Sequence, residues 1–358
     1  MSWHNKKFID FILLQRGHDL TKGQIIPGIY PVVTSTSIMG YHNTYKANGP
    51  GVVTGRSGTI GEVQYITENY WPHNTSLYVK DFKGNHPKFV YYFMKNFGTG
   101  RAKNGSSVPT LNRNNLSGID VKVPDYEIQV RIADILSSYD DLIENNQKQI
   151  KLLEEAAQRL YKEWFLDLHF PGYEDVKIVD GVPEGWKIHP IDDVFQIKYG
   201  KTLPTSKISS EGKYPVYGAN GIIGFYSEKN IDDYVVLITS RGNGSGDVLI
   251  THDKESFVTN NSFIVKPINH NVRLPFIHQL MKCTGFKNIC TGSAQPQLTN
   301  KSISTLCVLM PSYDLISRFC ETESVWYEKI EKLLTQNKLL NQARDRILPK
   351  LMSGEIEV

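Results

Sequence analysis

The sequence has no long apolar run, and this absence excludes one large class of proteins. Nowhere in its 358 residues does an uninterrupted hydrophobic stretch approach the roughly 20 residues that a membrane-spanning helix needs. The apolar stretch near the N-terminus, from Phe8 to Leu14, is too short for a signal peptide, and no small-residue cleavage site follows it. We therefore expect a cytoplasmic protein.

Cysteine is also scarce, and its spacing argues against a metal centre. The four cysteines all lie in the last quarter of the chain and form no C-x-x-C pair. His278 stands near the first of them, but the spacing fits no zinc pattern. We expect reduced and mostly buried thiols and no metal site. The four residues are Cys283, Cys290, Cys307 and Cys320.

The motifs of DNA methyltransferases and nucleotide-binding enzymes are missing. The chain contains no Pro-Pro pair, whereas the catalytic tetrapeptide of adenine and cytosine methyltransferases requires one. The glycine-rich run Gly242–Gly246 resembles a phosphate loop, but a β-rich run follows it where a helix N-terminus would be needed to hold the anion. Gly200-Lys201-Thr202 resembles the end of a Walker A motif, yet Phe195 stands where its first glycine belongs. Both runs are interpreted as turns.

No arrangement of acidic residues or histidines predicts catalysis either. Asp125 and Glu127 lack the nearby lysine of a metal-dependent nuclease, and Asp140-Asp141 is expected to form a solvated helix face. The ten histidines form neither an H-E-x-x-H motif nor an arrangement that identifies a triad. We predict no catalytic, cofactor-binding or metal-binding residue on this chain.

The charge of the chain is distributed unevenly. Residues 1–124 carry 14 Lys and Arg against 6 Asp and Glu, a net charge of +8, whereas residues 125–172 carry 5 against 10, a net charge of −5. Residues 173–310 carry 14 against 13, and residues 311–358 carry 7 against 8. Excess cations favour phosphate binding, while an acidic helix repels DNA and suits a protein partner.

The chain is an internal duplication. Four collinear blocks recur in the same order, and their offset rises by single residues from 184 to 187, as small loop insertions would produce. A single match would be weak support, but four collinear ones are not. The pairs are Tyr30-Pro31-Val32 with Tyr214-Pro215-Val216, Arg56–Val63 with Arg241–Val248, Asn74–Leu77 with Asn260–Phe263, and Gly105 to Arg131 with Gly292 to Arg318.

Each copy reads as a β-rich domain followed by one long helix. Short β-rich segments alternate with Gly, Asn, Ser and Pro turns, and further helix is expected near Pro87–Phe97 and Pro275–Cys283. Pro124 and Pro311 precede the long helices, since proline tolerates a helix start but not its middle. The first long helix is predicted from about Tyr126 to Leu168 and the second from about Tyr313 to Met352.

The two long helices share an apolar rhythm of three and four residues, which predicts a coiled coil. A helix lying on its own domain is the commoner cause of such a stripe, but the length and the duplication favour helix against helix. In an antiparallel pair about a pseudo-twofold axis, Asn146 would meet Asn337 and fix the register. The predicted seam comprises Tyr139, Ile143, Asn146, Ile150, Leu153, Leu160 and Trp164 on the first helix, and Trp326, Ile330, Leu333, Asn337, Leu340, Ile347 and Leu351 on the second.

Several loops carry side chains suited to DNA binding. The loops that begin at Arg56 and Arg241 each present one guanidinium at the equivalent place, and arginine bridges guanine bidentately or holds phosphate. Ordinary turn chemistry is the alternative for each of these residues. The candidate DNA-binding residues are Arg56, Ser57, Thr59, Arg113, Asn114, Lys201, Arg241, Asn243, Ser245 and Lys301.

The helical segments strongly resemble a known family. Residues 129–146 and 152–165, which include Leu153-Glu154-Glu155-Ala156-Ala157-Gln158-Arg159-Leu160-Tyr161, resemble the central region of specificity subunits of type I restriction–modification enzymes. Val182-Pro183-Glu184-Gly185-Trp186 and the C-terminal run from Lys350 to Ile356 point the same way, and the resemblance covers essentially the whole chain. One departure is the stretch before residue 16, which lacks the Pro-Glu-Gly-Trp motif of the second copy.

The resemblance implies a non-catalytic protein that reads double-stranded DNA. Each β-rich domain would be a target-recognition domain for one half of a bipartite asymmetric target, and the helices would set the spacer. Two modification (methyltransferase) subunits would carry S-adenosylmethionine, and restriction subunits would supply ATP- and Mg-dependent translocation and cleavage. A coiled-coil adaptor without direct DNA reading is the alternative, but it leaves the two arginine-looped domains unexplained.

These inferences define the expected architecture. We predict an α+β protein with two tandem globular target-recognition domains, mixed or β-rich, joined and followed by long helices that form an antiparallel, pseudo-twofold coiled coil. The predicted ranges are 1–124 and 173–310 for the recognition domains, and 125–172 and 311–358 for the central and C-terminal helical regions.

Overall fold

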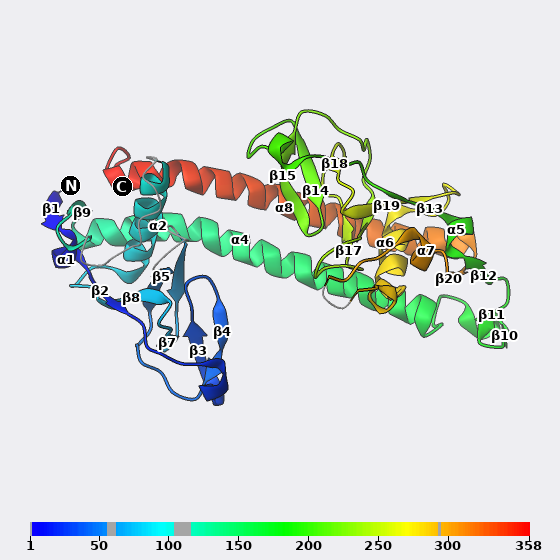
Figure 1. Cartoon of the computed structure of the whole chain (residues 1–358), viewed down its shortest axis with the longest axis horizontal. Coiled ribbons are helices and arrows are strands. Elements are labelled where there is room, and N and C mark those ends of the chain that lie inside the picture. The colour runs from blue at the N-terminus through cyan, green and yellow to red at the C-terminus, as the bar shows by residue number, and fades with distance from the viewer. Residues whose placement is uncertain (1, 56–61, 104–115, 293–294) are drawn as a thin grey trace. The chain divides into compact units, whose positions relative to one another are not determined.

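The computed structural model describes residues 2–55, 62–103, 116–292 and 295–358. These residues form two compact units (Figure 1). Unit 1 contains Met1–Asn145 and Gln336–Val358, and unit 2 contains Asn146–Thr335. Each unit therefore combines one β-rich domain with part of each long helix.

Unit 1 is built on a four-stranded sheet that is covered on both faces. The sheet has the order β2-β8-β5-β6, a three-stranded sheet has the order β4-β3-β7, and β1 pairs with β9. The elements are β1 (Trp3–Lys7), α1 (Phe8–Phe11), β2 (Leu13–Arg16), β3 (Pro27–Val33), β4 (Ile38–His42), β5 (Gly51–Gly55), β6 (Val63–Ile66), β7 (Trp71–Pro72), β8 (Ser76–Asp81), α2 (Pro87–Lys103) and β9 (Asp120–Pro124).

Unit 2 repeats this topology strand for strand. Its sheets have the orders β13-β19-β16-β17, β15-β14-β18 and β12-β20, and a short β10-β11 hairpin precedes them. The elements are β10 (Ile178–Val179), β11 (Val182–Pro183), β12 (Lys187–Pro190), α5 (Ile191–Val194), β13 (Phe195–Tyr199), β14 (Tyr214–Gly218), β15 (Gly221–Tyr226), β16 (Val236–Thr239), β17 (Val248–Ile250), β18 (Phe257–Val258), β19 (Ser262–Pro267), α6 (Leu274–Cys283), α7 (Asn300–Ile303) and β20 (Cys307–Met310).

The alternation of side chains along one strand explains how the four-stranded sheet is covered. On β5, Val52 belongs to the core shared with α2 and α4 (Tyr126–Tyr161), whereas Val53 belongs to the core beneath the three-stranded sheet. Successive side chains of a strand point to opposite faces, so one buried strand serves both cores. On β16 of unit 2, Val236 and Leu237 divide in the same way.

The start of the first copy matches the second copy better than its sequence indicates. In the β1–β9 ladder, Trp3 and His4 lie opposite Pro124 and Val123. In the β12–β20 ladder, Lys187 lies opposite Met310, the counterpart of Val123, so Lys187 is the counterpart of His4. Trp3 therefore occupies the position of Trp186, the residue before Lys187. Trp3 lies against Gly354 at the end of α8 (Tyr313–Ser353), and Trp186 packs on Phe170 with ring centroids 5.2 Å apart. The tryptophan of the Pro-Glu-Gly-Trp motif is therefore present in both copies.

The predicted long helices are confirmed. Helix α4 begins at Tyr126 and ends at Tyr161, where a short π-helix, Lys162–Leu166, extends it, and α8 runs from Tyr313 to Ser353. Within unit 1, the end of α8 packs beside the beginning of α4, and both contribute to one core. Every residue of the predicted seam is buried or half-buried, including Asn146 and Asn337. The pairing of these two asparagines stays a prediction.

The cysteines do not follow the expectation of mostly buried thiols. All four are free, but Cys283 and Cys307 are exposed, Cys290 is half-buried and only Cys320 is buried. Cys283 ends helix α6 and Cys307 begins β20, so both lie at element ends where the chain meets solvent.

In the part of the chain that the structure describes, no helix combines the length and the apolarity needed to cross a membrane.

Candidate nucleic-acid interface

The candidate DNA-binding loops of unit 2 converge because backbone hydrogen bonds tie them together. The N–H of Ser240 donates to Asn261 O at 2.8 Å, and the N–H of Asn260 donates to Lys201 O at 3.1 Å. On the other side, the N–H of Leu298 donates to Ser240 O at 2.9 Å. Four segments that are far apart in the sequence therefore meet at one edge of the four-stranded sheet.

The predicted cations project from these loops. Lys201, Arg241 and Lys301 are all exposed. Among the residues that the structure describes, no carboxylate forms an ion pair with any of the three. Exposed cations without a carboxylate partner remain available to bind phosphate oxygens or guanine edges.

The glycine-rich loop between β16 and β17 is a turn, as the sequence predicts. Gly242 and Gly246 have φ of +89° and +85°, which glycine adopts without strain. The N–H of Gly246 donates to Thr239 O at 2.8 Å, and strand β17 follows immediately. A Cβ at Gly246 would lie 2.7 Å from Lys287 N, so only glycine fits this approach.

The residues of this loop differ in how they face solvent. Asn243 is exposed, as a DNA contact would require. Ser245 is only 5% exposed, and its Oγ has no hydrogen-bond partner among the described residues. Ser245 is therefore less suited to reach DNA than Asn243. Asp247 at the end of the loop pairs with Lys287 at 2.6 Å, which holds the turn against the following 3-10 helix, Phe286–Ile289.

Lys301 is directed outward by a helix cap. Thr299 is the N-cap of α7, and its side chain accepts from Ser302 N at 3.2 Å while Ser302 Oγ accepts from Thr299 N at 3.1 Å. This capping box consumes both hydroxyl groups. Asn300 and Lys301 remain the exposed polar side chains of this segment.

The candidates in unit 1 lie largely outside the described residues. Arg56, Ser57 and Thr59 fall within 56–61, and Arg113 and Asn114 fall within 104–115. The base of the first of these loops is described: it joins β5 to β6, and Thr54 Oγ1 donates to Glu62 O at 3.0 Å. The strands that flank Arg56 are thus the counterparts of those that flank Arg241.

Unit 1 contains one candidate that the sequence comparison missed. The N–H of Gly17 donates to Ser76 O at 3.1 Å and that of His18 to Pro72 O at 2.7 Å. In unit 2, Gly200 donates to Ser262 O at 3.0 Å and Lys201 to Val258 O at 3.0 Å. His18 therefore occupies the position of Lys201. A shared glycine was the only sequence signal.

The environment of His18 differs from that of Lys201. Its imidazole lies near Trp71, with ring centroids 6.2 Å apart, and burial together with the nearby charge of Lys46 lowers its pKa. A lowered pKa keeps the imidazole neutral at pH 7. The equivalent backbone positions therefore present a neutral ring in one unit and a full cation in the other.

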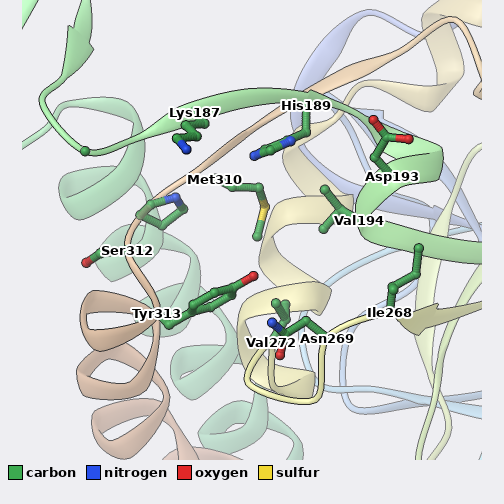
Figure 2. A pocket seen from close by; sticks show the side chains of 12 residues that line it. Lys187, His189, Asp193, Val194, Ile268, Asn269, Val272, Met310, Ser312 and Tyr313 are labelled. Atoms are coloured by element: carbon green, nitrogen blue, oxygen red, sulfur yellow. The ribbon is translucent and has the colours of Figure 1, made fainter.

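A separate cavity of about 610 Å³ lies in unit 2 where α8 begins (Figure 2). Lys187, His189 and Asp193 surround it, and Met310 and Tyr313 form part of its wall. None of the candidate DNA-binding residues of unit 2 lines this cavity.

The lining of this cavity differs from the equivalent residues of unit 1. In unit 1, the carboxylate of Asp125 accepts hydrogen bonds from Ser2 Oγ and, at 2.8 Å, from the ring of His4. The β1–β9 and β12–β20 ladders place Ser312 and Gly185 at the positions of Asp125 and Ser2. Ser312 and Gly185 are smaller than the residues they replace, and both line the cavity.

These observations define a class of protein. It is a tandem duplication in which each copy joins a β-rich domain to a long helix and carries no recognisable catalytic motif. A family model for the type I restriction modification DNA specificity domain matches residues 3–155 and 183–318, one match for each copy. The chain belongs to this family.

Relatives and a solved structure agree with this assignment. The chain is 28% identical over 283 residues to the specificity subunit of the type I restriction enzyme MjaIX of Methanocaldococcus jannaschii, covering 71% of this chain and 64% of the relative, slightly less than two thirds of its length. It is 25% identical over 385 residues to a putative type I specificity subunit of Mycoplasma genitalium, covering 100% and 95%. The crystal structure of the type I restriction–modification S subunit from M. genitalium has the same fold, with a TM-score of 0.62 and 21% identity over 98% and 96% of the two chains.

Proposed function

We propose that this chain is the non-catalytic DNA sequence-recognition subunit of a type I restriction–modification complex. Each β-rich domain reads one half of a bipartite asymmetric target in cytoplasmic DNA, and the paired helices set the spacer between the halves. The observation that carries the proposal is the repeated loop backbone with different side chains. His18 and Lys201 hold the same main-chain hydrogen bonds but offer different chemistry to a base or phosphate.

The proposal assigns the chemistry to partner subunits. Two modification subunits bind the helices and carry S-adenosylmethionine for adenine methylation. Restriction subunits join them and use ATP and Mg for translocation and cleavage. In this arrangement the present chain contributes only the choice of sequence.

Methylation mapping tests the proposal directly. The chain, co-expressed with its modification subunit in a host lacking other methyltransferases, should produce methylated adenines in one split sequence with a fixed spacer. Exchange of residues 1–124 for another recognition domain should change one half of that sequence only. The chain purified alone should transfer no methyl group from labelled S-adenosylmethionine, and transfer without a partner would overturn the proposal.

The same experiment separates the alternative function. A coiled-coil adaptor would bind its partner protein without favouring any DNA sequence. The basic first domain and the convergence of the loops that carry Lys201, Arg241 and Lys301 support the DNA-reading function instead.

A further inference from the structure

The tip of the β14–β15 hairpin lies against the glycine-rich loop of unit 2. The two-residue turn Ala219-Asn220 joins the two strands of this hairpin. Thr239, the last residue of β16, donates its Oγ1 hydrogen to Ala219 O at 2.6 Å. A Cβ at Gly244 would lie 2.9 Å from Asn220 Oδ1. The turn therefore adjoins the edge at which the candidate DNA-binding loops meet.

The amide of Asn220 is available to a ligand. Its side chain is exposed and forms no hydrogen bond within the part of the chain that the structure describes. Asn220 is not among the described residues other than glycine that have a positive φ, so the turn does not itself require asparagine. The nearby carboxylate of Asp247 is paired with Lys287 at 2.6 Å, so its charge is compensated.

Ile222 projects from the same hairpin toward the side of the glycine-rich loop. It lies directly opposite Tyr217, and residues directly opposite each other in an antiparallel pair share one face of the sheet. Tyr217 is buried in a core with Leu237 of β16, so this face is directed toward the four-stranded sheet. At the tip of the hairpin, Ile222 extends beyond that core and is 51% exposed.

The neighbouring isoleucine lies on the opposite face. A Cβ at Gly218 would lie 2.8 Å from Ile223 Cγ2, so the Ile223 side chain covers Gly218. Gly218 follows Tyr217, and successive residues of a strand face opposite sides of the sheet. Ile223 is 47% exposed, nearly as much as Ile222. The two isoleucines therefore differ in the side that they face and hardly in their exposure.

The hairpin of unit 1 keeps the isoleucine and changes the polar residue. In the β3–β4 hairpin, Ile38 lies opposite Val33, which is buried beneath the three-stranded sheet, and Ile38 is 42% exposed. The exposed residue Thr36 stands where unit 2 has Asn220. Single exposed apolar residues are common and need no explanation. An isoleucine exposed at the same tip of both recognition domains indicates a shared apolar contact beside a polar contact that differs.

These two side chains match the edge of one base pair. Asparagine pairs bidentately with N6 and N7 of adenine in the major groove, and apolar side chains contact the C5 methyl group of thymine. An isoleucine gains nothing from a phosphate, so its exposure beside the candidate DNA-binding loops suits a base edge. The A·T pair is the base pair that offers both features.

We propose that the β14–β15 hairpin is a further base-reading element of unit 2, in which Ile222 contacts a thymine methyl group and Asn220 pairs with an adenine. Ile38 makes the corresponding thymine contact in the other half of the target, where Thr36 replaces the adenine-reading amide. This inference rests on the proposed function, and it adds one A·T pair that each hairpin contacts.

Replacement of thymine by uracil tests the apolar contact, because it removes only the methyl group. The full complex of this chain with its modification subunit is titrated with fluorescent DNA of the methylated target sequence, in which each thymine is replaced by deoxyuridine in turn. In the half read by unit 2, one replacement should weaken binding about fourfold. With Ile222→Ala that replacement should have no further effect, and Ile38→Ala should do the same in the other half. Asn220→Ala should weaken binding on the order of tenfold and accept other base pairs at that position.

Ile223→Ala is the matched control, because it removes the same atoms from an equally exposed isoleucine on the other face. It should keep the wild-type affinity and the full effect of uracil. If no uracil weakens the wild-type complex, or if Ile222→Ala keeps the full effect, the inference is wrong, although a preference for the target sequence leaves the proposed function standing. A wild-type complex that binds every sequence equally overturns the proposed function itself. The uracil titration of the wild type needs no variant, so it decides the thymine contact even if a substitution disturbs the hairpin.

Discussion

Arg344 on α8 pairs with the carboxylate of Asp140 on α4, 204 residues earlier in the chain. The hydroxyl of Tyr92 on α2 donates to the same carboxylate at 2.7 Å. The Arg344 and Asp140 side chains are only 14% and 26% exposed, so the expectation that Asp140 faces solvent is wrong. One carboxylate joins three helices of unit 1, because each partner satisfies one of its oxygens.

Asp140→Asn should destabilise unit 1. The substitution leaves the half-buried guanidinium of Arg344 with a neutral partner on α4, which we expect to cost about 1–2 kcal/mol in the free energy of unfolding. Urea unfolding followed by circular dichroism measures the change. Asp141→Asn is the control, because this side chain is 69% exposed and lies 3.9 Å from Lys88. An equal effect of the two substitutions would show that the Arg344 pair contributes no stability.

Glu323→Gln should stabilise unit 2 at high pH. Glu323 on α8 is fully buried, Gln279 Nε2 donates to its Oε1 at 2.9 Å, and burial raises its pKa to about 8. The folded state therefore keeps a proton that the unfolded state loses above its ordinary pKa, near 4.5. This contribution to stability is full below the unfolded pKa and is lost as the pH rises to about 8.

The variant removes this loss of stability at high pH, since a neutral amide cannot ionise. The new amide can also donate an N–H to the Oε1 of Gln279, which has no partner among the described residues. We expect it to exceed the wild type by on the order of 1–3 kcal/mol above pH 8 and by little near pH 5. Urea unfolding from pH 5 to 9 measures the difference. Burial also lowers the pKa of His278 to about 3, but this effect is common to both proteins. A pH-independent difference would contradict the prediction.

Arg241→Ala should weaken recognition of one half of the target. Loss of an exposed guanidinium that contacts a base or phosphate should cost on the order of 1–3 kcal/mol of DNA binding and relax the sequence at that position. Fluorescence anisotropy of the full complex with DNA mutated in either half measures this. Arg318→Ala, an exposed arginine on α8, is the control and should leave both halves unchanged. Equal weakening on every sequence would identify Arg241 as a phosphate contact only.

Gly17→Ala should destabilise unit 1. A Cβ at Gly17 would lie 2.1 Å from His73 O, an approach that backbone atoms can relieve only by moving β2 away from β7. We expect a loss of about 1–3 kcal/mol, as in other overpacked sites. Differential scanning calorimetry checks it against Gly23→Ala, because nothing lies within 4 Å of a Cβ at Gly23. A melting temperature equal to that of the control would exclude this close approach.

The sequence by itself predicts the duplication and the long helices. Local patterns suffice there: collinear blocks reveal the repeat, and heptad spacing with Pro124 and Pro311 at the starts defines α4 and α8. The turn glycines Gly242 and Gly246 are predicted for the same reason, since a β-rich run follows them.

Only the tertiary structure decides which distant side chains meet. The pairing of Arg344 with Asp140, the equivalence of His18 with Lys201 and the burial of Ser245 depend on ladders and helix contacts between residues far apart in the chain. Such contacts leave no local periodicity, because one residue's partner is set by the register of another strand or helix. The sequence therefore determines the elements and their repetition, and the packing of those elements decides which charges are buried and which loops converge.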